Sequence, residues 1–332
     1  MKITNYKNIS KKIVQILKTE DKFVLFIHKY PDGDAMGSLL ALFCLLKKWR
    51  KNVEIAWDDE IPYQYIRLPY ANNLKKNHPQ INSKTILISL DNSTNNMINS
   101  LYPNLNSDNY KMIINIDHHY KNTKFGDINL IIPEAASVTQ ILYDIFKENK
   151  IKIDIEMAEC IYTGLVTDSG RFQYINTTVH SHLIAADLIS MGVNPNKIFK
   201  STYENKPKAT LNLHELMIKR TKTSKGGSLI YSYVLQDDLK KLNLPYSAST
   251  EFVGVIRAIE NVKLAAVFKQ QKDGTYRVSL RSSSDIDVSK IANKFGGGGH
   301  PMAAGYLCRV KKLNECIKHL EDEFIIDNYK FI

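Results

Sequence analysis

Short apolar runs alternate with longer apolar and amphipathic stretches over the first two thirds of the chain. The short runs are too brief for helices and typical of buried strands, and they cover residues 23–27, 53–57, 85–90 and 112–116. The longer stretches predict helices, and they cover residues 34–48, 137–148, 155–167 and 178–191. Because strands and helices alternate, we expect an α/β fold with a parallel sheet and helices on both faces.

The pattern changes after Gly192. Residues 193–224 are polar and lysine-rich, and we interpret them as a helical linker. The following strands are predicted at residues 229–234, 262–269 and 276–281, and helices near 249–259, 288–294 and 313–323. The sequence therefore predicts an N-terminal domain over residues 1–192 and a smaller α/β domain over residues 225–332.

The composition is that of a globular protein, with 44% hydrophobic and 24% charged residues among 332. The net charge of +11 favours polyanionic partners, but the lysine pairs are dispersed and form no basic stripe that could track a duplex or a long strand. The longest apolar run, residues 39–46, is far shorter than the roughly 20 residues that span a bilayer. The N-terminus also lacks a secretory apolar segment, so we expect a cytoplasmic protein without a membrane partner.

The four cysteines are Cys44, Cys160, Cys308 and Cys316. They include no Cys-x-x-Cys pair, so neither a structural zinc site nor a disulfide framework is expected. Scattered, reduced thiols agree with a cytoplasmic protein.

Candidate chemistry begins directly after the first predicted strand, in a turn that contains His28, Asp32 and Asp34. Ligands of open α/β sheets collect at the carboxyl ends of strands, and this turn offers one imidazole and two hard carboxylates there. Gly33 and Gly37 allow the close backbone approach that such a turn needs. The alternative is an ordinary capped loop with Asp34 as the N-cap of the next helix.

Acidic and imidazole side chains also follow two further predicted strands. Asp91 comes directly after residues 86–90, and the three residues after 113–116 are Asp117, His118 and His119. A single aspartate at a strand end is usually a cap or a turn residue. Three such strand ends would converge on one rim of the sheet, which caps alone do not explain.

A fourth segment carries Asp168, which follows an apolar helix and lies between Gly164 and Gly170. Taken alone, this aspartate could be a plain helix end. Together with the other segments it completes a mixed set of carboxylates and imidazoles. Such a set suits manganese or another hard-to-borderline divalent metal, not copper or structural zinc.

In order and spacing, these four segments resemble the four motifs of the DHH phosphoesterase family. Residues 281–283 and the glycine-rich residues 295–305 resemble the signature of the DHH-associated C-terminal domain. The resemblance extends over most of the chain, and the size is most similar to the stand-alone nanoRNase and pAp-phosphatase subgroup. Tyr30 stands where many relatives have Asn, a position that is not a ligand in the family pattern.

The resemblance implies two divalent ions, usually manganese, that share one bridging carboxylate, Asp91. One ion would be held by His28, Asp32 and Asp91. The other would be held by Asp34, Asp91, His118 and Asp168. Two further residues would act in catalysis: Asp117 would orient a histidine, and His119 would face the substrate phosphate.

For the C-terminal domain, the resemblance implies that substrate is bound by Arg281, Gly298, Gly299 and His300. Glycine backbone N–H groups can approach a phosphate closely, and an arginine at a strand end suits bidentate phosphate recognition. The structural alternatives are a flexible turn for the glycines and a surface arginine without a partner. Arg171, close to Asp168, is a further candidate whose alternative is a structural ion pair.

The implied function is that of a manganese-dependent phosphohydrolase. It would degrade very short oligoribonucleotides and dephosphorylate 3′-phosphoadenosine 5′-phosphate (pAp) to AMP. The nearest alternative is a soluble phosphodiesterase for cyclic di-AMP or its linear product pApA. A non-catalytic nucleotide-binding module is the alternative from another class.

Two other activities of the family are disfavoured. The inorganic pyrophosphatase branch lacks the glycine run that precedes His300 here. A long-strand DNA exonuclease is disfavoured because no extra nucleic-acid-binding domain is expected in a chain of this length. A homodimer is compatible with the family.

Overall fold

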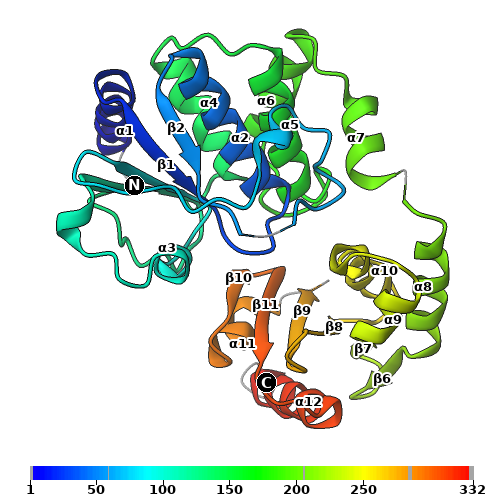
Figure 1. Ribbon diagram of the computed structural model, residues 1–332. Coiled ribbons are helices and arrows are strands. Elements are labelled where there is room, and N and C mark those ends of the chain that lie inside the picture. The colour runs from blue at the N-terminus through cyan, green and yellow to red at the C-terminus, as the bar shows by residue number, and fades with distance from the viewer. Residues whose placement is uncertain (1–2, 59, 205, 283–285, 329–332) are drawn as a thin grey trace. The chain divides into compact units, whose positions relative to one another are not determined.

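The computed structural model describes residues 3–58, 60–204, 206–282 and 286–328 (Figure 1). The chain divides into two compact units, Met1–Asn205 and Lys206–Ile332. The proposed linker, residues 193–224, spans this division. Helix α7 (Pro195–Tyr203) belongs to the first unit, whereas helix α8 (Ala209–Lys219) and strand β6 (Lys222–Ser224) belong to the second.

The first unit is built on a five-stranded parallel sheet with the strand order β2-β1-β3-β4-β5. Its strands are β1 (Lys22–Phe26), β2 (Asn52–Ile55), β3 (Ile86–Leu90), β4 (Met112–Asp117) and β5 (Ile128–Ile131). The four predicted strands are confirmed, and β5 adds a fifth. Since β1, β3 and β4 are neighbours, their carboxyl ends lie side by side at one edge of the sheet.

Helices cover both faces of this sheet, as predicted for the α/β fold (Figure 1). One face packs against α1 (Ile3–Thr19), α2 (Gly33–Lys48), α4 (Val138–Glu148) and α5 (Ile155–Asp168). Helices α6 (Val179–Ser190) and α7 pack on α5. The other face packs against α3 (Asn96–Leu101) through Ile98. Two short 3-10 turns, η1 (Ala71–Asn73) and η2 (Ser107–Asn109), lie in connecting loops.

Glycines allow α2 and α5 to touch. A Cβ atom on Gly33 would lie 2.3 Å from Oγ1 of Thr167, and one on Gly37 would lie 2.4 Å from the carbonyl oxygen of Cys160. No larger side chain fits at either place without moving one of the helices. The contact therefore brings the first turn of α2 to the end of α5.

The second unit contains a mixed six-stranded sheet with the order β10-β11-β9-β8-β7-β6, in which β7 and β8 are parallel. Besides β6, its strands are β7 (Leu229–Val234), β8 (Leu264–Gln270), β9 (Tyr276–Ser282), β10 (Gly298–His300) and β11 (Ala303–Cys308). The three predicted strands are confirmed as β7, β8 and β9. The hairpin of β10 and β11 is an addition to the prediction.

Two layers of helices flank this second sheet. One layer comprises α8, α9 (Gln236–Lys241), the 3-10 turn η3 (Tyr246–Ser249) and α10 (Phe252–Arg257). The other comprises α11 (Val288–Lys294) and α12 (Leu313–Asn328). The helix predicted over 249–259 is shorter in the structure, because η3 precedes it as a separate turn.

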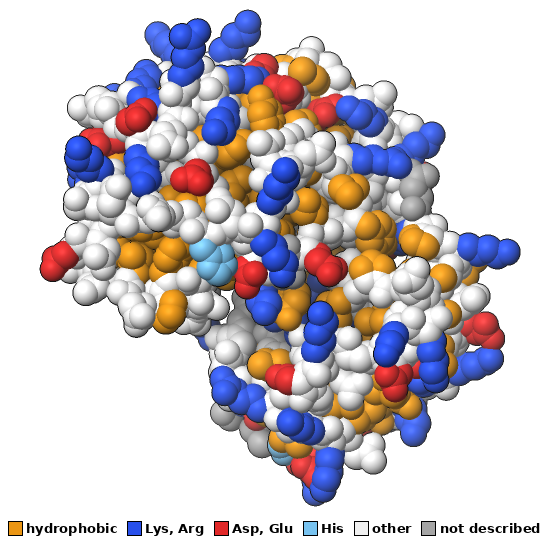
Figure 2. Space-filling model, in the orientation of Figure 1, with side chains coloured by type: hydrophobic (Ala, Val, Ile, Leu, Met, Phe, Trp, Pro, Cys, Tyr) orange, Lys and Arg blue, Asp and Glu red, His pale blue; other side chains and the backbone are white. Residues whose placement is uncertain are grey.

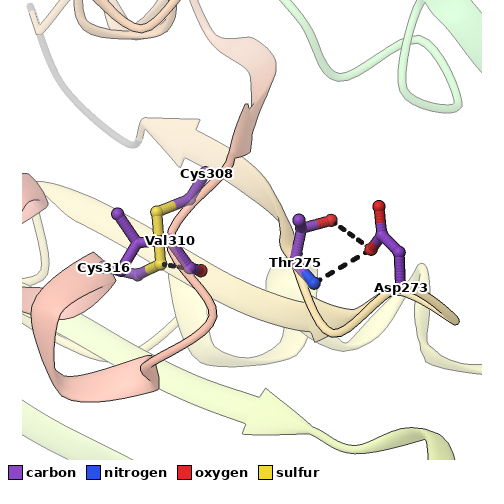
Figure 3. Close-up of a disulfide and its surroundings, with 5 residues drawn as sticks. All are labelled: Asp273, Thr275, Cys308, Val310 and Cys316. Carbon is purple, nitrogen blue, oxygen red and sulfur yellow. Dashed lines mark hydrogen bonds between the residues drawn. A yellow bond between two sulfur atoms is a disulfide. The ribbon is translucent and has the colours of Figure 1, made fainter.

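Cys308 and Cys316 form a disulfide, so the expectation of four reduced thiols is wrong for this pair (Figure 3). Strand β11 ends at Cys308 and the chain returns into α12, which brings the two Cα atoms within 6.2 Å. Spacing alone could not reveal this return. Cys44 and Cys160 are free and buried.

Figure 2 shows Lys and Arg side chains dispersed among acidic and neutral residues on the face in view. In the part of the chain that the structure describes, no helix combines the length and the apolar character needed to cross a membrane.

Candidate metal centre

Three neighbouring strand ends bring acidic and imidazole side chains together in the first unit. His28 follows β1, Asp91 follows β3, and His118 follows β4. Nε2 of His28 lies 3.4 Å from Oδ2 of Asp91, and Nε2 of His118 lies 3.7 Å from Oδ1 of Asp91. Asp91 therefore lies between the two imidazoles.

Asp91 has a left-handed backbone conformation, with φ of 56°. Its N–H still donates to the carbonyl of Ile116 at 3.1 Å, so the ladder between β3 and β4 continues up to this residue. Aspartate is one of the few non-glycine residues that adopt this conformation at modest cost. The turn lets the chain leave the sheet while the carboxylate stays at its edge.

Asp32, not Asp34, is the N-cap of α2. Oδ1 of Asp32 accepts hydrogen bonds from the N–H groups of Asp34 and Ala35, both at 3.0 Å. The alternative that made Asp34 a simple cap is therefore wrong. The carboxylate of Asp34 is directed instead to another element.

Asp34 is fully buried and is held by the N-terminus of α4. Its carboxylate accepts hydrogen bonds from the N–H of Val138 at 2.6 Å, the N–H of Thr139 at 2.9 Å and Oγ1 of Thr139 at 2.8 Å. Burial, followed by the charges of Asp91 and Asp32, nevertheless raises the pKa of Asp34 well above its ordinary value. The site thus holds more negative charge than its own donors neutralise.

His118 is oriented by a backbone carbonyl. Its Nδ1 lies 3.0 Å from the carbonyl oxygen of Ala135, which can only accept, so Nδ1 carries the proton. In the neutral ring, Nε2 then carries the lone pair. Burial and the nearby charge of His119 lower the pKa of His118 and favour this neutral form.

The lone pair of His118 faces three carboxylates. Its Nε2 lies 3.3 Å from Oδ2 of Asp168, in addition to Asp91, and 3.9 Å from Oδ2 of Asp34. Oδ2 of Asp168 and Oδ1 of Asp91 are buried without a hydrogen-bond partner among the described residues. Burial, followed by the charges of Asp34, Asp32 and Asp91, raises the pKa of Asp168. Acceptors gathered without a donor are costly unless a cation lies among them.

Several groups of donors have their ligand atoms within 4.8 Å of one another and could hold metal ions. Two of them contain the candidate ligands, and a third joins Asp91 to Asp117 and His119. The first consists of His28, Asp32 and Asp91, and the second of Asp34, Asp91 and His118. Asp91 is common to both. Carboxylate and imidazole donors fit a hard-to-borderline divalent ion.

His119 and Asp117 form a pair beside Asp91, in which Asp117 is buried and His119 is partly buried. Nδ1 of His119 lies 2.7 Å from Oδ1 of Asp117, and Nδ2 of Asn122 donates to Oδ2 of the same carboxylate at 2.6 Å. Although burial opposes it, the charge and hydrogen bond of Asp117 raise the pKa of His119 to about 10. In the absence of metal, the pair is therefore an imidazolium and a carboxylate at neutral pH.

The chain matches two family models. Residues 22–165 match the N-terminal domain of the DHH family, and residues 226–325 match the DHHA1 domain. The chain therefore combines a DHH N-terminal domain with a DHHA1 domain. The matched ranges include every candidate ligand except Asp168, which lies just beyond the first.

Two curated relatives are similar to this DHH protein over most of their own length. It is 28% identical to the bifunctional oligoribonuclease and PAP phosphatase NrnA of Thermus thermophilus, over 88% of this chain and 86% of the relative. It is 27% identical to the protein of the same name from Bacillus subtilis, over 88% of this chain and 91% of the relative. The family and these relatives indicate a hydrolytic phosphoesterase.

A solved structure shares the fold. An exopolyphosphatase-related protein of Bacteroides fragilis superposes with a TM-score of 0.85 at 24% identity, covering 98% of this chain and 97% of that one. The likeness supports the α/β architecture predicted from the sequence.

The candidate substrate residues of this DHH protein's second unit lie close together on one sheet. Ala303 of β11 pairs with Arg281 on one side and with His300 on the other, so the three residues share a face. Gly298 leaves open space where a Cβ would lie, whereas Gly299 has φ of 135° and contacts β11 closely. The glycines are thus part of a β-hairpin, and the alternative of a merely flexible turn is wrong.

Arg171 belongs to the first unit and stacks on an aromatic ring. Its guanidinium lies 4.4 Å from the ring centroid of Tyr203. This contact differs from the ion pair considered as its structural alternative. A role in substrate binding stays a prediction.

Sequence reasoning did not find the residues that hold the ligands in place. Thr139 and Asn122 are the main ones, since they bond Asp34 and Asp117 directly. Ser137, the N-cap of α4, was available as a signal, because a capped helix N-terminus attracts carboxylates. Which carboxylate it attracts depends on the packing of α2 against α4.

Proposed function

We propose that this protein is a manganese-dependent phosphohydrolase that degrades very short oligoribonucleotides and converts pAp to AMP. The observation that carries the proposal is the position of Asp91, which is shared by the two groups that contain the candidate metal ligands. The names of the relatives, which combine both activities, support the choice of substrates.

Two divalent ions would be held by residues of the first unit. His28, Asp32 and Asp91 would hold one, and Asp34, Asp91, His118 and Asp168 the other. When bound, such a pair lowers the pKa of a water molecule and neutralises phosphate oxygens during in-line attack. The Ala135 carbonyl keeps the proton of His118 on Nδ1, so that the lone pair on Nε2 could bind a metal ion.

The protein's own groups would act on the leaving side of the reaction. Asp117 holds His119 by one ring nitrogen, which leaves Nε2 to face a substrate phosphate. Held in this way by Asp117, His119 could stabilise developing charge or give a proton to the leaving oxygen. Asp117 is in this view a positioning residue.

Substrate would be bound by the DHHA1 unit. Arg281 would bind a phosphate by its guanidinium, and the backbone of Gly298 and Gly299 would approach the nucleotide next to His300. Arg171 is a further candidate in the first unit, because its guanidinium, which stacks on Tyr203, could bind a phosphate.

A kinetic comparison with manganese tests the proposal. The substrates are pAp, an RNA series of two to five nucleotides, pApA and cyclic di-AMP, with Asp91→Asn as the inactive control. We expect the highest kcat/KM for short RNA and pAp. A highest value for cyclic di-AMP would make the substrate assignment wrong. Nucleotide binding without release of phosphate or mononucleotide would indicate a binding module.

A further inference from the structure

A buried lysine lies beside the candidate substrate residues of the second unit. Lys269 of β8 pairs with Arg277 of β9 in the antiparallel ladder, so both side chains are on the same face of the sheet. Arg281 follows four residues later on β9 and is therefore on that face too. Three cations thus gather on the face that also carries His300.

Lys269 lacks the partner that a buried lysine normally has. Its side chain is only 4% exposed. Among the described residues, no carboxylate pairs with its ammonium, which lies 5.2 Å from the ring centroid of Tyr246. Lysine is almost never fully buried unless paired, and an uncompensated buried charge is strongly destabilising.

The surroundings of Lys269 make its buried charge still more destabilising. Burial, followed by the charges of Arg277 and Arg281, lowers the pKa of Lys269 to about 7. The groups acting on the ammonium are thus two guanidiniums from β9 and the ring of Tyr246 from η3. None of these carries negative charge at neutral pH.

The adjacent part of the face is accessible. Five residues of β9 and β11 are partly exposed and alternate with buried residues of the same strands: Arg277, Ser279, Arg281, Ala303 and Gly305. Ser279 pairs with Gly305, and Arg281 with Ala303, so small residues lie beside both arginines. Small side chains next to two arginines leave room for a ligand group.

We infer that Lys269, Arg277 and Arg281 form a second anion site, which binds the phosphate of the nucleotide that is not hydrolysed. The inference rests on the proposed function, because it takes the ligand to be a phosphorylated nucleotide. A phosphate dianion supplies a counter-charge for Lys269, and guanidiniums bind such a group through paired hydrogen bonds. For pAp, this group is the 5′-phosphate, since the 3′-phosphate is removed.

The test compares two substrates that differ only in that phosphate. The KM and kcat for pAp and for adenosine 3′-monophosphate are measured for wild type, Lys269→Met and Arg277→Met. Lys263→Met is the matched control, because Lys263 is an exposed lysine near the start of the same strand. Methionine keeps the length of the buried stem and removes the charge. Calorimetric binding of pAp by the manganese-free protein is measured in parallel.

We expect Lys269→Met and Arg277→Met to raise the KM for pAp by roughly tenfold or more, as for a lost hydrogen bond to a charged group. The KM for adenosine 3′-monophosphate should change less than twofold, and Lys263→Met should leave both values unchanged. Equal effects on both substrates, or none on pAp in either variant, would overturn the inference while the proposed function stands. If wild type hydrolyses neither substrate, the proposed function fails. Calorimetry then tests the anion site by itself. Equal affinity of wild type and Lys269→Met for pAp would overturn the site as well.

Discussion

Nε2 of His118, directly after β4, lies 3.3 Å from Oδ2 of Asp168, the last residue of α5. Because the Ala135 carbonyl fixes the proton of His118 on Nδ1, this nitrogen and this oxygen are both acceptors in the neutral state. Two acceptors at such a distance repel each other unless a proton or a metal ion lies between them. The relationship is the strongest local reason to expect a cation here.

Asp91→Asn should abolish turnover without unfolding the protein. Asparagine tolerates the left-handed backbone of this position, so the turn is kept while the shared carboxylate is lost. We expect kcat/KM to fall roughly a thousandfold or more, which corresponds to about 4 kcal/mol. Bound manganese, measured by elemental analysis, should fall with it. The exposed Asp108→Asn is the control, and wild-type activity in Asp91→Asn would refute the assignment.

Removal of metal should destabilise the first unit. Asp34, Asp91 and Asp168 lose the cation that offsets their mutual repulsion. Manganese added to the metal-free protein should raise Tm, with about 2.7 kcal/mol of stabilisation per site at a hundredfold excess over Kd. Scanning fluorimetry measures this shift. An equal shift in Asp91→Asn would show that manganese binds elsewhere.

Asp117→Asn should lower the pKa of His119. In the metal-free protein, the folded-state pKa of His119 is raised to about 10 from 6.5. The pair therefore stabilises the fold fully below pH 6.5 and loses this effect as the pH rises through about 10. Proton NMR of the imidazole in Asp117→Asn should show a pKa close to the ordinary value. A pKa that stays near 10 would mean that another group holds the proton.

Lys269 should make the stability of the second unit depend on pH. Its folded-state pKa is lowered to about 7 from 10.5, so the unfolded chain binds more protons between these values. The charged lysine destabilises the fold fully below pH 7, and stability returns as the pH rises, by up to about 1.4 kcal/mol per unit. Lys269→Met should therefore exceed wild type in Tm at pH 6 by more than at pH 9. A difference in Tm that is the same at pH 6 and pH 9 would contradict the buried, unpaired state of Lys269.

Gly164→Ala should disturb the site through its contacts with Thr139 and Asp34. A Cβ there would lie 2.5 Å from Oγ1 of Thr139 and 2.8 Å from Oδ1 of Asp34, so it would force these two groups apart. We expect a loss of about 1–3 kcal/mol in stability and weaker manganese binding, measured by thermal shift and calorimetry. Gly254→Ala is the control, since Gly254 lies in α10 with open space around its Cα. Unchanged manganese affinity in Gly164→Ala would show that Asp34 is not held as described.

The metal-type donors could be predicted from the sequence because they follow apolar runs. Strands β1, β3 and β4 are short and mostly apolar, and their apolar runs end at His28, Asp91 and Asp117. Parallel pairing then brings these ends to one edge whatever the remaining details are. The prediction needed no side-chain geometry.

Features that depend on packing between distant segments could not be predicted. The hairpin of β10 and β11 contains a glycine run with little strand propensity, and it forms because β11 pairs with β9. The disulfide depends on the return of the chain after Cys308. Lys269 did carry a signal, since it stands at an inward position of an apolar strand, but its lack of a counter-charge is visible only in the structure.

The contact of α2 with α5 has a consequence for attempts to build this site elsewhere. The loop that carries Asp32 and Asp34 keeps its shape because Gly33 and Gly37 lie against Thr167 and Cys160. A designer who grafted only that loop onto another parallel sheet would transfer the ligands without the surface that shapes them. To transfer Asp32 and Asp34 in their present positions, a graft would have to include both α2 and α5 together with the first turn of α4.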